Sequence, residues 1–313
     1  MLAFVARRLL IFVPTLLIIS VFIFALQKLM PGDVAIALAG EDRNVDVIAH
    51  IRAKYRLDDP IWVQYFVWLG AILQGDFGHS IMMRTDVGPL LLQKLAVTLQ
   101  LSFMAMFIAV VIGVPAGVLA AAKQGTIWDY LANIGALSGL SVPNFWLGII
   151  LILVVSVYLG WLPASGYVSP FVDPWRSLQT TIMPAFVLGT AIAGMLMRHT
   201  RSAMLEVLRS DYIRTARSKG ISERRIIVSH ALRNALVPIV TFSSVIFGEL
   251  LAGAVLTEQI FSIPGLGKLI VDAVFNRDFA VVQGVVLLSA LVFLIFNLTA
   301  DVANMLLNPR TQK

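Results

Sequence analysis

Six long apolar stretches, separated by polar segments, set the hydropathy pattern of this chain of 313 residues. Each stretch is long enough for a helix to cross the roughly 30 Å hydrocarbon core of a bilayer. They cover residues 9–29, 98–122, 130–159, 181–203, 236–261 and 281–307. The pattern therefore predicts an all-α, polytopic membrane protein with about six transmembrane helices.

Composition supports this class and removes several others. Hydrophobic residues make up 58% of the chain, charged residues 13%, and the mean hydropathy is +0.86. These values lie outside the range of soluble globular domains. The chain has no cysteine, which excludes a disulfide framework, a thiol nucleophile and a cysteine-ligated metal site.

Basic residues gather on one side of the predicted membrane. They are Arg7 and Arg8 before the first stretch, Lys123 after the second, the segment 198–235, and Arg310 with Lys313 after the last. An even number of spans puts both termini on that side, and the positive-inside rule predicts that it is cytoplasmic. Topology and contact with anionic lipid account for the net charge of +6, so no nucleic-acid partner is expected.

The chain divides by this pattern into three predicted parts. Residues 1–30 form an N-terminal transmembrane helix, residues 31–97 an external segment, and residues 98–313 a core with five transmembrane helices. We expect the first helix to remain as a signal anchor, because it is longer than the apolar core of about 7–15 residues found in cleaved signal peptides.

The external segment is patterned rather than random. Helical spacing predicts one helix over residues 45–57 and a second that begins at Pro60 and carries Trp62, Tyr65 and Trp68. The three aromatic residues either lie at the level of the lipid headgroups or form a docking surface for an external delivery protein. Both hypotheses stay open at this point.

Few ionisable residues lie inside the apolar stretches. Glu249 falls near the middle of the fifth stretch and Glu258 near its outer end. A charge at the bilayer centre costs about 2.5–3.5 kcal/mol on insertion scales, so such a side chain is expected to face protein or water. Glu249, Glu258 and Asn144 are therefore candidates for lining a translocation pathway. The alternative is hydrogen bonding between helices, with Asn133, Asn144 or Asn297 as the partner of Glu249.

Enzyme motifs are missing from the sequence. It contains no H-E-x-x-H zinc motif and no G-x-S-x-G nucleophile turn, and its four histidines are scattered. Gly267-Lys268 resembles the end of a phosphate-binding loop, but Ser262 replaces the first glycine and Leu269 replaces the magnesium-binding Ser or Thr. No catalytic or metal-ligating residue is expected, and the chain is not expected to hydrolyse ATP itself.

The segment 198–235 holds nine of the 24 Lys and Arg residues. Apolar residues recur at helical spacing between these charges, which predicts amphipathic helices rather than a solvated tail. One helix is expected over residues 213–219, Gly220 ends it, and Ser222 with Glu223 begins a second helix. A loop ordered in this way predicts a docking surface for another protein.

This arrangement resembles the cytoplasmic coupling loop of ABC importer permeases. The general pattern there is Glu-Ala-Ala, three residues, Gly, nine residues and Ile-x-Leu-Pro, and Ala216, Gly220 and Leu232 fit it in register. The chain departs from the pattern at four positions, with Arg214 in place of Glu, Thr215 of the first Ala, His230 of Ile and Arg233 of Pro.

Longer motifs are similar to those of the dipeptide, oligopeptide and nickel permease family, over essentially the whole chain. They include DYIRTARSKG at 211–220, HALRNALVPIVT at 230–241, SVPNFW at 141–146, TEQIFSIPGLGKLI at 257–270 and NRDFAVVQG at 276–284. Small departures are Ile263, where the family often has Trp, and Phe279-Ala280, where Tyr-Pro is usual.

The resemblance implies a type I ABC importer permease fold and a multi-pass subunit of a bacterial inner membrane. It implies four kinds of partner: a homologous second permease, two ABC ATPases that bind ATP and Mg, an external solute-binding protein, and the lipid bilayer. No cofactor is expected in this chain itself. The ATPase-coupling loop near 204–235 would use Asp211, Tyr212, Arg214, Thr215, Ala216, Arg217, Gly220, Arg225, His230 and Leu232.

The sequence does not decide which substrate is transported. Related permeases carry dipeptides, longer peptides, glutathione or nickel, and we expect di- or oligopeptides, with nickel or glutathione as the alternatives. An ion-coupled secondary transporter is the alternative of another class. That class normally has inverted repeats or several intramembrane charges, and neither is apparent in the sequence.

Overall fold

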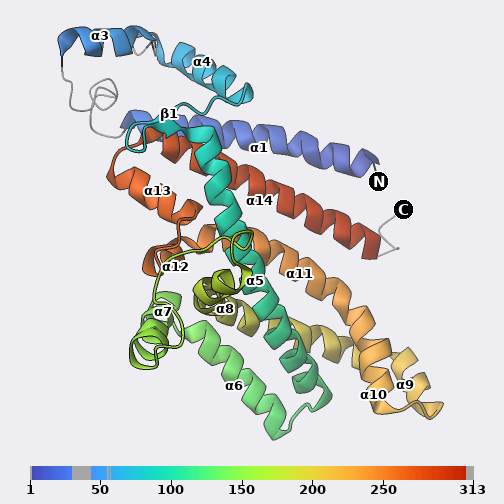
Figure 1. Ribbon diagram of the computed structural model, residues 1–313. Coiled ribbons are helices and arrows are strands. Elements are labelled where there is room, and N and C mark those ends of the chain that lie inside the picture. The colour runs from blue at the N-terminus through green and yellow to red at the C-terminus, as the bar shows by residue number, and fades with distance from the viewer. Residues whose placement is uncertain (1, 30–43, 55, 57, 308–313) are drawn as a thin grey trace. The chain divides into compact units, whose positions relative to one another are not determined.

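The computed structural model describes residues 2–29, 44–54, 56 and 58–307. Arg310 and Lys313, which are predicted to lie on the basic side of the membrane, are outside this range. The described part is almost entirely helical, as expected from the sequence, with one short β-hairpin (Figure 1). It divides into two compact units. Of the described residues, unit 1 comprises 97–264 and 293–307, and unit 2 comprises those between 2 and 96 and those from 265 to 292.

Unit 1 contains most of the long helices, and the last part of α14 (Phe279–Leu307) belongs to it. The elements are the greater part of α5 (Val87–Ala122), α6 (Ile127–Ser141), α7 (Asn144–Leu151), the π-helical η1 (Ile152–Tyr158), α8 (Pro174–Leu208), α9 (Asp211–Ser218), α10 (Glu223–Arg225), the π-helical η2 (Ile226–Ala231), α11 (Leu232–Gly253) and α12 (Val255–Ile260).

Unit 2 contains α1 (Leu2–Leu29), α3 (Val45–Lys54), α4 (Ile61–Leu73) and α13 (Leu266–Phe275). It also contains the hairpin of β1 (His79–Ser80) and β2 (Thr85–Asp86), in which His79 pairs with Asp86 and Ser80 with Thr85. The hairpin is fixed near its turn, because the Ser80 hydroxyl donates a hydrogen bond of 2.6 Å to the buried Asp278 carboxylate. The two helices predicted over residues 45–57 and after Pro60 are confirmed as α3 and α4.

Five described helices are long and apolar enough to span a membrane, or six if one bent pair counts as a single span. The bent pair is α6 with α7 and η1, which meet at an angle of 95°. The predicted span over 130–159 is therefore a bent pair of helices that breaks at Val142 and Pro143. Pro143 lacks an amide hydrogen and disfavours helical backbone in the preceding residue, and Val142 is accordingly extended (φ −81°, ψ 119°).

The fifth apolar stretch is also divided. α11 ends at Gly253, Ala254 follows, and α12 begins at Val255. The second stretch is longer than expected, since α5 begins at Val87 rather than at residue 98.

Helix α8 is the central element of unit 1. Asp173 caps its start by accepting a hydrogen bond of 3.0 Å from the Arg176 amide, and Pro174 occupies the first turn. Along its length α8 packs against α6, α7 and α11. Its contact with α5 is very close, because a Cβ atom at Gly117 would lie 2.6 Å from the Met197 carbonyl oxygen. Glycine is required at this position for the two backbones to approach.

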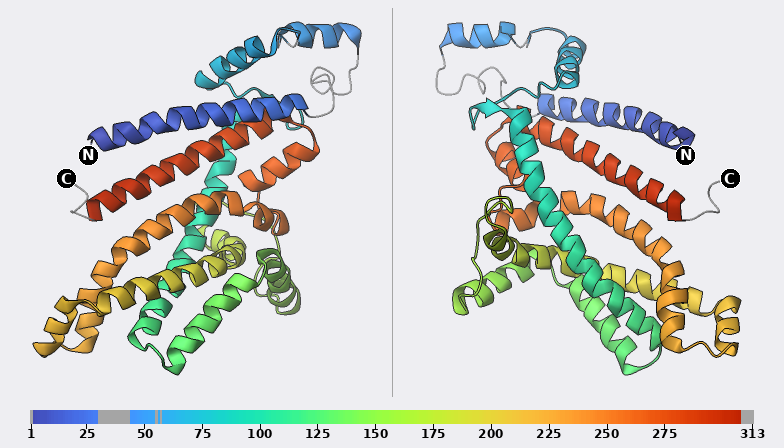
Figure 2. Two further views of the ribbon diagram at one scale, coloured as in Figure 1. Left: turned by 180° about the vertical axis from the view of Figure 1, so that it is seen from behind. Right: turned by 45° about the vertical axis from the view of Figure 1, so that its right-hand side comes forward.

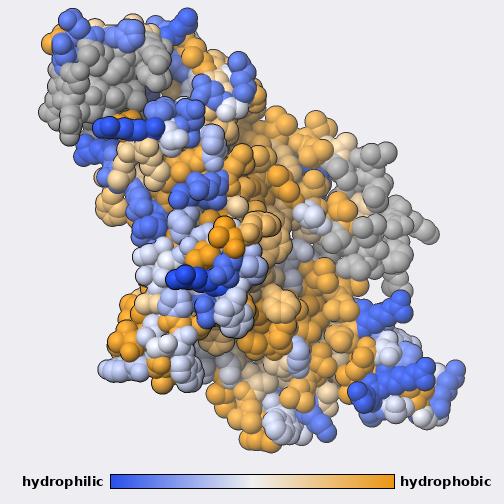
Figure 3. Space-filling view, viewed as in Figure 1, coloured by the Kyte–Doolittle hydropathy of each residue, from blue (hydrophilic) through white to orange (hydrophobic). Residues whose placement is uncertain are grey.

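The core of unit 1 lies between α5, α8, α11 and α12. Leu101, Leu188, Phe247 and Phe261 are among its buried members. A second buried cluster joins the end of α8 to α9, η2 and the start of α11. Figures 1 and 2 show α9 and α10 projecting at the end of α8 and α11. In Figure 3 hydrophilic residues gather over that projection at the lower right, whereas hydrophobic residues cover much of the neighbouring helices.

Candidate functional site

The projection formed by α9, Gly220 and α10 is built around a glycine corner. Gly220 has a φ of +75°, in the left-handed region that favours glycine. Its amide donates to the Arg217 carbonyl at 2.9 Å, and the Ile221 amide donates to the Ala216 carbonyl at 3.3 Å. This pair of bonds is the Schellman arrangement that ends helices at glycine. The predicted helix, glycine corner and second helix are therefore confirmed in geometry.

The inner face of the corner is apolar and buried. Ile213 and Ala216 on α9 pack with Ile226 and Ala231 on η2 and with Met204 near the end of α8. Half-buried Leu232 packs against the same cluster. Because these side chains link α9 to two long helices, the corner cannot move without displacing the ends of α8 and α11.

The outer face of the corner is polar and exposed. Asp211, Arg214, Thr215 and Arg225 are all exposed. Arg214 and Asp211 form an exposed ion pair of 3.5 Å within α9, whereas within the described part of the chain Arg225 forms no ion pair. A projecting, charged surface on a rigid apolar base is suited to contact a complementary partner surface.

Arg217 has a partner inside the corner. Its Nε and Nη2 atoms donate to the two carboxylate oxygens of Glu223 at 2.7 and 3.3 Å. Hydrogen bonding to Glu223 raises the pKa of the Arg217 guanidinium. The sequence assigned Arg217 to an external contact, and the structure gives it the further role of bracing α9 against α10.

We expect that breaking this brace weakens coupling and that exchanging the charges restores it. Arg217→Glu places two carboxylates together, while Arg217→Glu with Glu223→Arg re-forms the pair in the opposite sense. The exposed pair contributes about 1 kcal/mol or less to stability, so the single variant should still fold. Substrate uptake per ATP hydrolysed, measured for both variants, checks this expectation. Equal loss in the single and double variants would show that Arg217 acts only through an outside partner.

Tyr212 ties α9 to the start of α11. Its hydroxyl accepts a hydrogen bond of 2.7 Å from the Asn234 side-chain amide, which also donates to the His230 carbonyl at 3.0 Å. His230 therefore enters the site through its backbone oxygen. Asn234 was missed by the sequence reasoning, although it lies inside a motif that carried the family resemblance.

The end of α8 nearest the corner is held to α6 by an ion pair. Arg201 donates from Nε and Nη2 to the two carboxylate oxygens of Asp129 at 2.7 and 2.8 Å. Asp129 is buried and also accepts from the Asn133 side chain at 2.8 Å and the Gly125 amide at 3.0 Å. This fully satisfied pair makes α6 follow the end of α8. No pattern in the sequence indicates this pair, because the partners are 72 residues apart.

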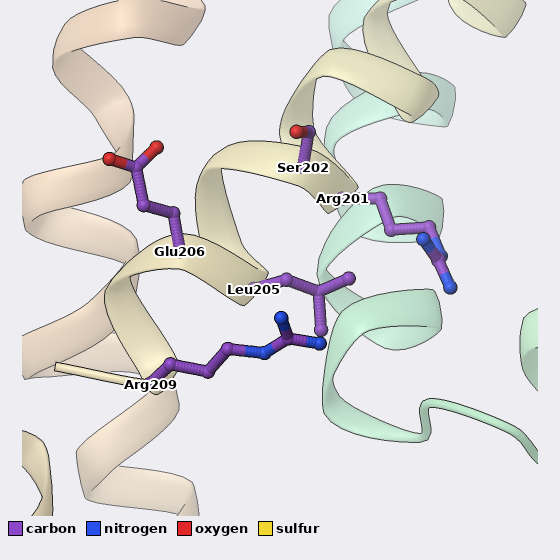
Figure 4. A pocket seen from close by; sticks show the side chains of 5 residues that line it. All are labelled: Arg201, Ser202, Leu205, Glu206 and Arg209. Carbon is purple, nitrogen blue, oxygen red and sulfur yellow. The ribbon is translucent and has the colours of Figure 1, made fainter.

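Two hollows are lined by residues near the end of α8, and the second is also lined by residues of the corner. The first has a volume of about 450 Å³ and is lined by Arg201, Ser202, Leu205, Glu206 and Arg209 of α8 (Figure 4). Arg201, Leu205 and Arg209 extend to one side of the helix, and the Glu206 carboxylate points away from them. The second, of about 230 Å³, lies between the end of α5, α8 and the brace of Arg217 with Glu223. Arg209 lines both hollows and adds a positive charge beside the corner.

The candidate pathway residues are not brought together at one site. Glu258 is fully buried and accepts a hydrogen bond of 2.6 Å from the Thr98 hydroxyl, which favours helix packing over a pathway role. Glu249 is exposed on α11, and Asn144 is half-buried at the first residue of α7. Among the described residues Glu249 forms no hydrogen bond with Asn133, Asn144 or Asn297, and Asn133 bonds to Asp129 instead.

The three candidate docking residues of α4 do not share one environment. Trp62 is 67% exposed. Tyr65 and Trp68 pack on Phe24 of α1 with ring centroids 5.5 Å apart in each pair, and the Tyr65 hydroxyl is 2.8 Å from the Ser20 hydroxyl. The sequence could not distinguish an aromatic residue that packs on a neighbouring helix from one that faces water.

Nearly the whole chain matches one family of membrane transport components. Residues 113–313 match the family described as binding-protein-dependent transport system inner membrane component, and residues 1–102 match its N-terminal membrane component. No group of three or more His, Asp or Glu residues that could hold a metal occurs within the described ranges.

The chain is similar to curated proteins over its whole length. It is 43% identical to the di/tripeptide transport system permease protein DppB of Pseudomonas aeruginosa, covering 99% of this chain and 98% of the relative. It is 41% identical to the oligopeptide transport system permease protein AppB of Bacillus subtilis, covering 100% of both.

Among solved structures, an inward-facing form of the MetNI methionine ABC transporter aligns with a TM-score of 0.59. The sequences are 20% identical, and the match covers 70% of this chain and 96% of that chain. This similarity supports the type I importer permease fold. The chain therefore belongs to the inner membrane components of binding-protein-dependent transport systems, in the dipeptide and oligopeptide permease family.

Proposed function

We propose that this protein is the permease subunit of an ATP-driven importer of di- or oligopeptides. The observation that carries the proposal is a sequence identity above 40% over the full chain to permeases named for di- and tripeptides and for oligopeptides. An external solute-binding protein would deliver the peptide, and a second, homologous permease would complete the pore. ATP and Mg would bind to two separate ATPase subunits.

The corner is the part of this chain that would contact the ATPase subunits and move when they hydrolyse ATP. Its exposed charges at Arg214 and Arg225 would contact the ATPase, with Arg209 extending the basic surface. ATP-driven closure of two ATPases would displace the corner as a rigid body. This orientation requires the corner and both termini to be cytoplasmic, in agreement with the positive-inside rule.

The contacts inside unit 1 support transmission of that displacement. The buried cluster around Ile213 joins the corner to α8 and α11. Arg201 and Asp129 join α8 to α6, and the close approach at Gly117 joins α8 to α5. A shift at the corner would therefore move several spanning helices together, which is the requirement for alternating between inward-open and outward-open forms.

The pathway and docking assignments are part of the same proposal. Glu249 is the preferred pathway residue, because an exposed carboxylate in an apolar helix needs water or protein beside it. Asn144, at the break between α6 and α7, remains a candidate pathway residue. Glu258 is assigned a structural role. On α4, Trp62 is the residue left to receive a delivery protein, since Tyr65 and Trp68 are engaged with α1.

Transport by the reconstituted complex tests the proposed function. The chain would be purified with the products of adjacent genes and placed in vesicles, and uptake of a labelled dipeptide would be followed with ATP or with an ion gradient alone. Unlabelled dipeptides, longer peptides, glutathione and nickel would be compared as competitors. Uptake that needs ATP and is reduced by peptides supports the proposal. Competition by nickel or glutathione alone would change the substrate, and uptake driven by the ion gradient would favour a secondary transporter.

A further inference from the structure

The loop of residues 159–173, which joins η1 to α8, presents apolar side chains outward. Phe171 is 97% exposed and Val172 is 81% exposed. Trp161 in the same loop and Trp175 in the first turn of α8 are 71% and 68% exposed. Isolated apolar residues at a surface need no explanation, but a group of large ones in one short loop indicates a contact surface.

This exposure is not the result of a loose loop. The Gly166 amide donates to the Phe261 carbonyl at 3.0 Å. The Tyr167 hydroxyl donates to the Gln100 side-chain oxygen at 2.7 Å, and Gln100 in turn donates to the Ser177 hydroxyl at 2.9 Å. The loop is thus anchored to Gln100 within α5, to the start of α8 and to the end of α12, and it holds Phe171 outward in a fixed position.

Charge distinguishes a lipid surface from a protein partner here. Asp173 is the one charged residue in the sequence from 159 to 175, and its carboxylate caps α8 through the Arg176 amide. A docking surface for a soluble protein normally has a polar rim, and this loop offers little. Exposed Trp residues at the ends of spanning helices are typical of the membrane interface.

The position of the loop at the ends of two spans also indicates contact with lipid. Trp175 is the second residue of the candidate span α8, and Tyr158 is the last residue of the bent span before the loop. Both lie where a span ends. Phe171 precedes Trp175 by four residues, so its Cα lies within about 14 Å of that boundary. The headgroup region is about 5–7 Å thick on each side of the hydrocarbon, which keeps the loop close to the lipid.

We propose that residues 159–175 form an interfacial anchor, with Phe171 and Val172 inserted into the lipid leaflet opposite the coupling corner. The anchor fixes one end of α8, the helix whose other end carries the corner. α8 then pivots about the anchored end when the corner is displaced. The insertion itself does not depend on peptide transport, whereas the role as a pivot rests on the proposed function.

The absence of cysteine from the sequence makes a direct test possible. Phe171→Cys, labelled with an environment-sensitive fluorophore, would be compared with Ser218→Cys on the exposed end of α9. Both would be studied in the complete complex in vesicles, with nitroxide-bearing phospholipid or aqueous iodide as the quencher. Because Phe171 is almost fully exposed, its replacement removes no packing contact. We expect nitroxide lipid to quench the label at 171 at least about twofold more than the label at 218, with iodide showing the reverse.

Each other outcome contradicts the anchor. Quenching by iodide that is lost when the solute-binding protein is added would assign the loop to that protein. Protection from both quenchers in the complex would place it against the second permease. Equal quenching of 171 and 218 by iodide would leave the loop in water. Peptide uptake, measured on the same samples, separates a failure of the anchor from a failure of the proposed function.

Discussion

Gly220→Val is expected to leave the protein in the membrane and to uncouple ATP hydrolysis from uptake. The φ of +75° at Gly220 places a Cβ atom in conflict with its own backbone, which costs roughly 1–2 kcal/mol and more for a β-branched residue. A cost of that size reduces the fraction of molecules with the correct corner by about tenfold. Peptide uptake should fall to a similar extent.

The cause would be the backbone alone, because no atom beyond the two adjoining residues lies within 4 Å of the Cβ position at Gly220. Gly220→Asn is therefore the matched control, since asparagine tolerates the left-handed region. Uptake and ATP hydrolysis would be measured together in vesicles. We expect Asn to retain most of the uptake and Val to hydrolyse ATP without it. Normal uptake by the Val variant would show that the geometry of the corner is not needed.

Gly117→Leu is expected to disrupt packing between α5 and α8 and to destabilise the folded chain. A Cβ atom at Gly117 would lie 2.6 Å from both the Met197 carbonyl oxygen and the Thr200 Cβ. Overpacking of this kind costs about 1–3 kcal/mol, and more where backbone atoms must move. Since α8 carries the corner, the loss should reduce assembly of the complex as well as stability.

Gly135→Leu on α6 is the control, because nothing lies within 4 Å of its Cβ position. The thermal midpoint and the yield of each purified variant in detergent provide the measurement. We expect a clear fall for Gly117→Leu and little change for Gly135→Leu. Equal stability of the two would mean that α5 and α8 are not in the close contact described.

Local features of the fold followed from the sequence because their causes are local. Gly220 after an amphipathic stretch and Ser222 before Glu223 predict a helix end and a helix start wherever the chain lies in space. The break in the helix before Pro143 also has a local cause, because proline lacks an amide hydrogen and disfavours helical backbone in the preceding residue. The bend of 95° could not be predicted, because its size depends on how α7 packs on α8 and α12.

Features that join distant residues did not follow from the sequence. Asp129 and Arg201 are 72 residues apart, and Thr98 and Glu258 are 160 apart, so hydropathy and spacing place each partner on its helix without pairing them. Tyr65 resembled an exposed docking residue for the same reason. The family resemblance supplied the role of the corner, while the structure supplied the brace of Arg217 with Glu223.

If the exposed face of the corner contacts an ATPase, a cross-linker placed at Ser218 will react with that subunit. Ser218→Cys in the otherwise cysteine-free chain would carry a short photoreactive label in the active, reconstituted complex. Val172→Cys, on the loop at the opposite end of α8, would carry the same label as the control. We expect an adduct with the ATPase from position 218, with a yield that changes when ATP is added, and none from position 172. A complex that transports peptide without forming the adduct at 218 would contradict this contact.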